Sequence, residues 1–462
     1  MLFSGATFLY AFLPVVILLY FLSPKKLKNY VLLIASLVFY FFGEPVYVLL
    51  LIFSSLSDWL HSLYIEKHRG TKAAKTALIS SVVINLAMLG FFKYIDFFIG
   101  TVNGIFKTNI PLTGVPLPIG ISFFTFQTMS YTIDVYRGRA HAQRDLGTLA
   151  TFVCLFPQLI AGPIVRYTDV AAELEERTHT LEGVANGARR FAFGMGKKVL
   201  IANIMGELCS IFRASTDKSV LFYWLYAVAF SLQIYFDFSG YSDMAIGLGG
   251  MFGFHFPENF NYPYISRSIT EFWRRWHMTL GGWFRDYVYI PLGGNRTTKL
   301  KWLRNIAVVW LLTGLWHGAE WNFVLWGGFF GVMLIIEKLW LGNLLEKLPR
   351  FVSHIYVMVL VVLSFVVFNA DGLAGVVSDI GGLFGAGHLP LVSAEAVYYL
   401  KSYAGPILIA IVGSTPLPKW LYGKLHEGPK TVLEPAATGV LLILSTALII
   451  NGSFNPFLYF RF

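Results

Sequence analysis

Charged residues are scarce in this sequence. Lysine, arginine, aspartate and glutamate make up 13% of the 462 residues, whereas 56% are hydrophobic, and an ordinary soluble domain is about one quarter charged. The composition therefore indicates a membrane protein rather than a water-soluble one.

Cysteine is rare as well: Cys154 and Cys209 are the only two, and both lie in apolar surroundings without C-x-x-C or Cys/His spacing. Neither a disulfide framework nor a metal site is predicted.

Apolar stretches recur along the whole chain with short polar breaks between them. A helix needs about 20 apolar residues to cross the hydrocarbon of a bilayer. The candidate spans are Gly5–Leu22, Tyr30–Phe42, Val46–Tyr64, Thr76–Phe92, Ile119–Val135, Leu149–Val165, Phe191–Phe212, Val220–Phe238, Ile306–Trp316, Phe323–Trp340, Phe351–Phe368, Ala404–Val412 and Ala437–Ile450. Several are too short to cross unaided, so we expect some to be re-entrant or tilted pieces packed inside the protein. The sequence predicts an all-α polytopic membrane protein with one integral membrane domain, residues 1–462.

Basic residues exceed acidic ones by 10, and the excess lies in clusters between the apolar stretches. Such loops report orientation in the membrane rather than nucleic-acid binding, so no nucleic-acid partner is expected. The first stretch has no basic segment before it and no cleavage signature after it, which favours a retained span over a removed signal peptide. Lysines follow this span at Lys25, Lys26 and Lys28, and the positive-inside rule then predicts an outside N-terminus.

The stretch from Asn259 to Arg304 combines clustered basic residues with many aromatic ones. The basic residues are Arg267, Arg274, Arg275, Arg285, Arg296, Lys299, Lys301 and Arg304. By the positive-inside rule this stretch belongs on or near the cytoplasmic face. The segment Ile265–Tyr289 is not a clean span, and we expect short helices that lie in the interface or dip into it. Pro291–Asn295 is expected to form a turn.

His317 is the histidine most suited to chemistry. It lies in an apolar segment where the other strongly polar side chains are Glu320 and Asn322, and a polar group at membrane depth is costly unless it is used or paired. Imidazole accepts and donates protons near neutral pH, so a buried histidine beside a substrate cavity suits a general base that activates a hydroxyl. A hydrogen-bonded packing role is the alternative. Gly314 and Gly318 would let a substrate or a neighbouring helix approach closely.

His277 is a second candidate with a weaker local context. It follows Trp276 and is expected one helical turn after Trp273 and Arg274. An interfacial histidine beside arginines is often a structural hydrogen-bonding group, so both a structural and a functional role remain open.

Three arginines near His277 have two possible uses. Arg274, Arg275 and Arg285 could pair with Glu271 and Asp286. They could also bind the phosphates of an acyl carrier such as a coenzyme or a phosphopantetheine group. The same side-chain geometry serves both uses, and the sequence does not separate them.

Two carboxylates, Asp237 and Asp243, lie in an otherwise apolar and aromatic region. They could orient a catalytic histidine, bind a cation, pair internally or cap helices, with Ser239 and Ser242 offering the capping alternative. No nucleophilic serine in a G-x-S-x-G pattern is present. The residues expected to bind the donor or the substrate are Arg274, Arg275, Trp276, Arg285, Trp316, Asn322, Asp237 and Asp243.

Three runs of residues carry a resemblance to known proteins: FWRRWHMTLGGWFRDYVYIPLGGNR from Phe272, GLWHGAEWNF from Gly314 and YFDFSGYSDMAIG from Tyr235. They resemble the membrane-bound O-acyltransferase (MBOAT) family, and Phe156–Arg166 and Asn455–Phe462 fit the same family. The resemblance covers nearly the whole chain, and its paired-histidine signature is specific. Within the family the chain is most similar to the membrane subunit of bacterial alginate O-acetylation, and more distantly to the D-alanyl transferase of teichoic acid modification.

The resemblance implies a fold of about eleven transmembrane helices, with re-entrant and interfacial helices around a central funnel or tunnel. His317 would be the catalytic histidine, in a passage between a cytoplasmic donor side and an outward-facing funnel. His277 would be the second signature histidine, either assisting or structural. The implied activity is an acyltransferase that moves an acyl group, expected to be acetyl, for O-acetylation of alginate or a similar extracytoplasmic polysaccharide.

The resemblance also implies partners. The donor would be acetyl-CoA or an acyl-carrier thioester on the cytoplasmic side, which is a substrate and not a bound cofactor. Alginate-type members act as one half of a relay that a separate extracytoplasmic, SGNH-hydrolase-like acetyltransferase completes. We expect such a partner, together with membrane lipids, in the cytoplasmic (inner) membrane of a bacterium.

The reaction leaves two routes open. Direct transfer from the thioester to a hydroxyl needs no acyl-enzyme, whereas a transient acyl-histidine is the competing route. Other classes also remain: Asp237, Asp243 and Glu320 could relay protons in a transporter or flippase, and the chain could be a scaffold for polymer export. Within the enzyme class, D-alanyl transfer and acylation of a lipid or protein hydroxyl are the alternatives.

Overall fold

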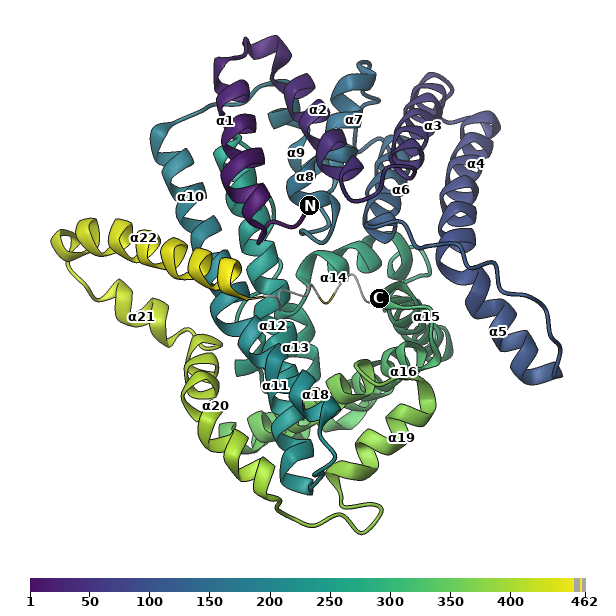
Figure 1. Cartoon of the computed structure of the whole chain (residues 1–462). Helices are drawn as coiled ribbons and strands as arrows, with labels where there is room; N and C mark the ends of the chain where they lie inside the picture. The colour runs from purple at the N-terminus through teal and green to yellow at the C-terminus, as the bar shows by residue number, and fades with distance from the viewer. Residues whose placement is uncertain (453–457, 459–462) are drawn as a thin grey trace. The chain divides into compact units, whose positions relative to one another are not determined.

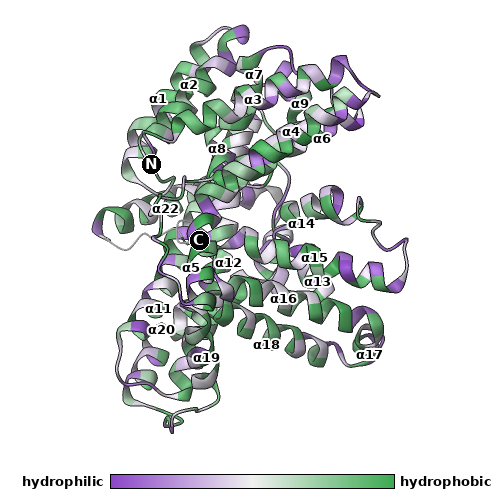
Figure 2. Ribbon diagram, turned by 90° about the vertical axis from the view of Figure 1, so that its right-hand side faces the viewer, coloured by the Kyte–Doolittle hydropathy of each residue, from purple (hydrophilic) through white to green (hydrophobic). Residues whose placement is uncertain are grey.

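The computed structural model describes residues 1–452 and Leu458, and in this part of the chain all regular secondary structure is helical (Figure 1). Helix is the expected form because it satisfies the backbone hydrogen bonds within one segment, as hydrocarbon requires. Figure 2 shows hydrophobic residues along most of these helices and hydrophilic residues in several connecting loops. The predicted all-α polytopic class is confirmed.

Seven helical segments of the described residues are long and apolar enough to cross a membrane. They are Val48–Lys67, Lys72–Phe106, Val220–Met251, Trp321–Lys347, Arg350–Phe368, Ala394–Gly413 and Gly428–Asn451. Phe8–Leu22 and Gly372–Leu383 are shorter apolar helices. Length and composition therefore support seven spans, and the count of about eleven stays a prediction.

The residues fall into two compact units, of which the first comprises Met1–Phe191 and Tyr241–Pro257. Its helices are α1 (Leu13–Leu22), α2 (Lys28–Phe41), α3 (Val48–Lys67), α4 (Lys72–Leu89), α5 (Ile95–Phe106), α6 (Ile121–Arg137), α7 (Leu146–Cys154), α8 (Phe156–Leu159), α9 (Tyr167–Glu175) and α10 (Leu181–Gly196), the last continuing into the second unit.

Helices α3, α4 and α6 pack around a buried carboxylate. Asp58 of α3 accepts hydrogen bonds from Ser81 Oγ at 2.6 Å and Asn85 Nδ2 at 2.8 Å, both on α4. Thr128 of α6 donates to the Asn85 oxygen at 3.1 Å. Of the 17 residues of α6, 14 are buried. The expected span Ile119–Val135 is therefore a helix packed inside this unit.

The expected single span Leu149–Val165 is wrong. Helix α7 ends at Cys154, the chain turns out of helical geometry at Leu155 (ψ 110°), and the short helix α8 follows. Pro157 lies in the first turn of α8, where its missing N–H costs no helical hydrogen bond, so a new helix starts there instead of α7 continuing. The segment is a broken, buried piece of the kind expected for re-entrant chain.

The second unit comprises Ala192–Gly240 and Glu258–Phe462. Its helices are α11 (Asn203–Ala214), α12 (Val220–Met251, which continues into the first unit), α13 (Ile269–Arg275), α14 (Met278–Phe284), α15 (Lys299–His317), α16 (Trp321–Ile336), α17 (Gly342–Lys347), α18 (Arg350–Phe368), α19 (Gly372–Leu383), α20 (Ala394–Gly413), α21 (Leu417–Gly423) and α22 (Glu427–Asn451). The Asn455–Phe462 segment lies outside the described residues except for Leu458.

Two expected spans in this part of the chain have different bounds. The expected span Phe191–Phe212 belongs to a longer helical run, in which α10 continues through a π-helical turn, Lys197–Ala202, into α11. The expected span Val220–Phe238 continues without a break to Met251. Asp237 and Asp243 therefore lie within a helix, not at its ends.

The helical hairpin of α15 and α16 is held at very close approach by glycines. A Cβ atom at Gly314 would lie 2.3 Å from the Phe323 carbonyl oxygen, and one at Gly327 would lie 2.3 Å from the Trp310 carbonyl oxygen. A Cβ at Gly318 would meet the Phe323 ring at 2.1 Å. Of the two uses proposed for Gly314 and Gly318, the structure shows the approach of a neighbouring helix.

The basic, aromatic stretch forms short helices, as predicted. Helices α13 and α14 have seven residues each and are followed by a π-helical turn, Arg285–Tyr289. The predicted turn at Pro291–Asn295 is also present, and Gly293 and Gly294 adopt positive φ angles of 105° and 56° there. Glycine accepts such angles at no steric cost.

Candidate active site

A small cavity in the second unit brings several predicted residues together. Its volume is about 10 Å³, roughly the room that one water molecule needs. Asp237 of α12, Trp276 at the end of α13 and His317 of α15 line it. The other lining residues are Ile234, Phe238, Trp326, Phe365, Phe368 and Leu458. The cavity is thus an aromatic enclosure with one imidazole and one carboxylate.

His317 is the last residue of α15 and is 5% exposed. Aromatic rings surround it edge-on, with ring centroids at 5.1 Å for Trp326 and 5.4 Å for Phe368. The C-terminal end of a helix carries partial negative charge, which favours the imidazolium that forms when a histidine takes up a proton. The position therefore suits a group that accepts a proton and later returns it.

His277 lies next to His317, and the centroids of the two rings are 6.2 Å apart. It is fully buried and adopts a left-handed conformation, φ 45° and ψ 51°, between α13 and α14. The expectation that it continues the helix of Trp273 and Arg274 is wrong, because α13 ends at Arg275. Left-handed geometry is strained for a residue with a side chain and persists only where its surroundings impose it.

Asn259 imposes that geometry and was not predicted. His277 Nδ1 donates to the Asn259 side-chain oxygen at 3.1 Å, and Thr279 Oγ1 donates to the same oxygen at 2.9 Å. The Met278 N–H donates to the Asn259 carbonyl oxygen at 3.0 Å. With Nδ1 as the donor, Nε2 carries the lone pair, and Nε2 has no hydrogen-bond partner among the described residues. No spacing rule in the sequence links Asn259 to His277.

Lys198 is the second residue that sequence reasoning missed. Its Nζ lies 2.6 Å from Asp237 Oδ1, and the two side chains are 4% and 2% exposed. Leu458 N–H donates to the other oxygen of Asp237 at 2.9 Å. A lysine inside the apolar stretch Phe191–Phe212 was a signal that could have found it, since a charge at membrane depth needs a partner.

Asp243 lies in the first unit and does not line the cavity. It forms an ion pair with Arg190, with Nη2 2.9 Å from Oδ1. The capping role considered for Asp237 and Asp243 is wrong, because α12 continues past both residues to Met251. The alternative of internal pairing is confirmed for each of them.

Two of the three arginines form the ion pairs considered for them, and the third does not. Arg275 pairs with Glu271 at 3.0 Å, and Arg285 pairs with Asp286 at 2.7 Å. Arg274 is exposed, and no ion pair joins it to a carboxylate in the part of the chain that the structure describes. Arg274 therefore keeps its charge available for an anion.

The remaining predicted residues, Trp316 and Asn322, lie beside the site and do not line the cavity. Trp316 is buried, with its ring centroid 5.0 Å from that of His317 and 5.7 Å from that of His277. Asn322 Nδ2 donates to the carbonyl oxygens of Phe368 and Ala370 at 3.2 and 3.0 Å. Asn322 thus ties the start of α16 to the end of α18, next to the cavity.

A family model described as MBOAT, the membrane-bound O-acyltransferase family, matches residues 46–378. The chain belongs to this family.

Its relatives include a probable alginate O-acetylase of Azotobacter vinelandii, 39% identical over 503 residues and covering 100% of both chains. A peptidoglycan O-acetyltransferase of Helicobacter pylori is 32% identical and covers 100% of this chain and 98% of its own. A teichoic acid D-alanyltransferase of Bacillus subtilis is 32% identical over 47% of this chain and 58% of its own.

The family assignment confirms that the chain is an acyltransferase and a multi-pass membrane protein. The predicted resemblances to alginate O-acetylation proteins and, more distantly, to D-alanyltransferases are confirmed as well. The roles of the individual site residues are argued below from the geometry.

Proposed function

We propose that this acyltransferase passes an acetyl group from a cytoplasmic thioester donor, acetyl-CoA or an acyl carrier, towards an extracytoplasmic polysaccharide such as alginate, where the group ends as an ester on a sugar hydroxyl. The observation that carries the proposal is the buried His317, which lines an aromatic cavity in a chain whose full-length relatives are named probable alginate O-acetylase and peptidoglycan O-acetyltransferase.

In the proposed reaction His317 is the catalytic base. The acceptor hydroxyl gives its proton to the imidazole as its oxygen attacks the thioester carbonyl carbon. The carbon–sulfur bond then breaks, and the leaving thiolate takes the proton back from the imidazolium. A positioned base of this kind contributes about 10²- to 10⁴-fold to a rate. Direct transfer of this type needs no acyl-enzyme.

His277 and Asn259 act as positioning residues in this scheme. The hydrogen bond from His277 Nδ1 to Asn259 fixes the ring behind His317. Asn259→Ala should lower kcat about tenfold or more, because the buried hydrogen bond that fixes the His277 ring is lost. Asn259→Asp keeps an acceptor oxygen and should restore part of the rate. A purely structural role predicts loss of folded protein in both variants.

The basic stretch Asn259–Arg304 is proposed to bind the acyl donor. Arg274, exposed and without a carboxylate partner in the described residues, is placed to bind a phosphate of the donor. Arg275 and Arg285 are already paired with Glu271 and Asp286 and would bind a phosphate only by sharing their charge. Among the three, Arg274→Gln should therefore raise the KM for the donor most.

Asp237 contributes through its charge. Paired with Lys198, it places a fixed dipole in the wall of the His317 cavity, where an imidazolium forms during the reaction. We therefore propose that this ion pair keeps the electric field at His317 fixed and does not itself transfer the proton. Trp276 and Trp316 are proposed to exclude water from the site.

Completion of the transfer is proposed to need an extracytoplasmic acetyltransferase, of the SGNH-hydrolase type that the family resemblance implies, in or at a bacterial cytoplasmic membrane. Acetylation of free polymer by the purified chain alone, at the rate seen in cells, would refute this part of the proposal.

The test uses the purified chain in proteoliposomes with labelled acetyl-CoA and a soluble hydroxyl acceptor. His317→Ala should lower acetyl transfer by about 10²-fold or more, whereas His426→Ala, at an exposed histidine, should leave it unchanged. Preference for an aminoacyl carrier over acetyl-CoA would favour D-alanyl transfer. Ion-coupled uptake that persists in His317→Ala would favour a transporter.

A further inference from the structure

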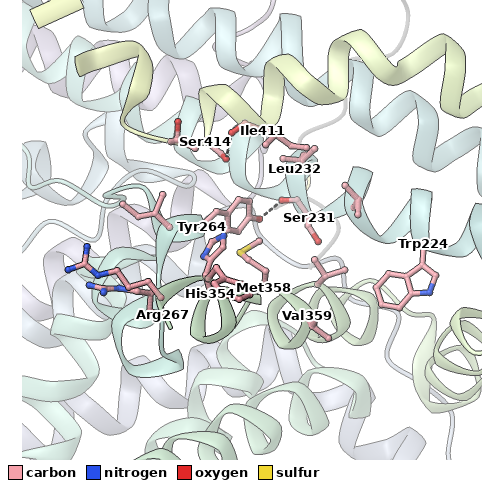
Figure 3. Close-up of a pocket in the computed structure, with 16 residues that line it drawn as sticks. Trp224, Ser231, Leu232, Tyr264, Arg267, His354, Met358, Val359, Ile411 and Ser414 are labelled. Carbon is pink, nitrogen blue, oxygen red and sulfur yellow. Dashed lines mark hydrogen bonds between the residues drawn. The ribbon is translucent and has the colours of Figure 1, made fainter. Parts of the chain in front are cut away.

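The second unit contains a larger cavity, of about 640 Å³, which the acyl-transfer site does not use. Its walls come from α12, the segment before α13, the first four turns of α18 and the end of α20. Figure 3 shows Arg267 at one end and Trp224 at the other. Among the described residues no acidic one lines it. The Glu271 carboxylate, which accepts the Arg267 N–H at 2.9 Å, pairs with Arg275 outside the lining. The cavity therefore combines an apolar interior with a positive end.

The positive end is built by two segments that meet. His354 Nδ1 donates to the Ser266 carbonyl oxygen at 3.1 Å, which joins the second turn of α18 to the residue before Arg267. Arg350 lies one turn before His354 on α18, on the same side of the helix. Arg267 and Arg350 are both exposed, and neither side chain forms an ion pair within the described residues. Two free guanidinium groups at one site fit a phosphate.

The rest of the cavity offers a ligand almost no hydrogen-bond donors. Ser231, Ser414 and Thr415 line it, but their hydroxyls donate to carbonyl oxygens of their own segments, those of Ala227, Ile411 and Val412. The Tyr264 hydroxyl donates to the Ser231 carbonyl oxygen (Figure 3). A ligand portion with amide carbonyls would lose hydrogen bonds to water here, whereas a hydrocarbon chain would lose none.

The cavity borders exposed apolar side chains on two candidate membrane spans. Val359 of α18 is 41% exposed and Ile411 of α20 is 46% exposed, and both helices are candidate membrane spans. The apolar wall on α18 extends from Phe351 to Val362, about 16 Å at 1.5 Å per residue. One leaflet of hydrocarbon is about 15 Å thick. The cavity thus has the depth of one leaflet, with its arginines at the end of a span.

We propose that this cavity binds a glycerophospholipid of the adjoining leaflet, with the lipid phosphate between Arg267 and Arg350 and an acyl chain along α18 towards Trp224. The site is separate from the acyl-transfer cavity, and the proposal does not depend on the acyltransferase mechanism.

A coenzyme-type donor is the occupant that the test must separate from a lipid. Both carry phosphate, and the two cavities are neighbours along the same helices: Val362 of α18 lines the larger cavity and Phe365, one turn later, lines the His317 cavity. The pantetheine arm, however, carries two amides that the donor-poor wall cannot satisfy. The observations therefore favour a lipid.

The experiment measures phospholipid retention by native mass spectrometry of the chain purified in mild detergent, followed by titration with phosphatidylglycerol. Arg267→Gln/Arg350→Gln should weaken lipid binding about tenfold or more. Lys299→Gln/Lys301→Gln removes the same charge from two exposed lysines and should leave binding unchanged. Val359→Trp fills the part of the cavity proposed for the acyl chain, keeps both arginines and should also displace the lipid. It provides a second test if the double arginine variant does not fold.

Equal retention by wild type and the Arg267/Arg350 double variant would overturn the proposal. Displacement of the bound lipid by acetyl-CoA at matched concentration would overturn it in favour of a donor site. Inorganic phosphate alone should displace little lipid, because it replaces only the headgroup contacts; complete displacement by phosphate would show a bare anion site and would also overturn the proposal.

Discussion

Lys198→Met tests whether the buried ion pair beside His317 is a structural necessity. Lys198 and Asp237 are 2.6 Å apart and almost inaccessible to solvent. At this separation the attraction is about 6 kcal/mol with an effective dielectric constant of about 20. Desolvation costs several kcal/mol for each ion, so the intact pair contributes little net free energy.

Removing one partner is different, because the other charge stays buried. The cost of breaking such a pair is about 3–5 kcal/mol. We expect Lys198→Met to lower the free energy of unfolding by that amount, and Asp237→Asn to have a cost of similar size. In the double variant Lys198→Met/Asp237→Asn no buried charge remains, so we expect the loss to be clearly smaller than the sum of the two single losses.

The assay is denaturation of the purified chain in detergent for the wild type, both single variants and the double variant. Lys301→Met removes a lysine from the exposed start of α15 and should change stability by less than about 0.5 kcal/mol. If Lys198→Met is as stable as Lys301→Met, or if the single losses simply add, the buried pair does not exist as described.

Two other predictions concern packing and pH. In a thermal unfolding assay, Gly314→Ala should destabilise the chain by about 1–3 kcal/mol or more, because the new Cβ would meet the backbone of α16 at 2.3 Å. Gly328→Ala is the control and should be neutral or slightly stabilising, because no atom of a neighbouring element lies within 4 Å of its Cβ. Burial, reinforced by neighbouring positive charges, lowers the pKa of His179, which shares a 2.8 Å hydrogen bond with the Tyr20 hydroxyl. The contribution of neutral His179 to stability is complete above the ordinary histidine pKa of about 6.5 and is lost as pH falls through the lower folded-state pKa. His179→Gln should therefore flatten the acid side of the plot of unfolding free energy against pH. An unchanged plot would contradict this.

The helical class and the buried setting of His317 could be predicted because their signals are local, whereas His277 was singled out by the family resemblance. Long apolar stretches require helices in a membrane, and the apolar surroundings of His317 mark it without any knowledge of the fold. The pairing of Arg275 with Glu271 was likewise foreseen as one of two uses, since residues four apart on a helix are neighbours.

Other features depend on contacts that the sequence does not display. The left-handed conformation of His277 is imposed by Asn259, which is distant along the chain. The buried interior position of α6 follows from how neighbouring helices pack, whereas hydropathy alone marks the stretch as a span. The break after α7 is different, because Pro157 was a local signal that hydropathy does not register. Lys198 could have been noticed as an intramembrane charge, but its partner Asp237 is fixed only by the fold.

The central claim, that His317 is the catalytic base of acetyl transfer, is tested most directly by the acetyl-ester content of surface polysaccharide. A deletion strain of the source bacterium is complemented with wild type, His317→Ala or His277→Ala at matched membrane levels. The account predicts that His317→Ala inserts normally and restores no acetyl ester. Wild-type acetylation by His317→Ala would contradict it and would favour a scaffold or transporter role.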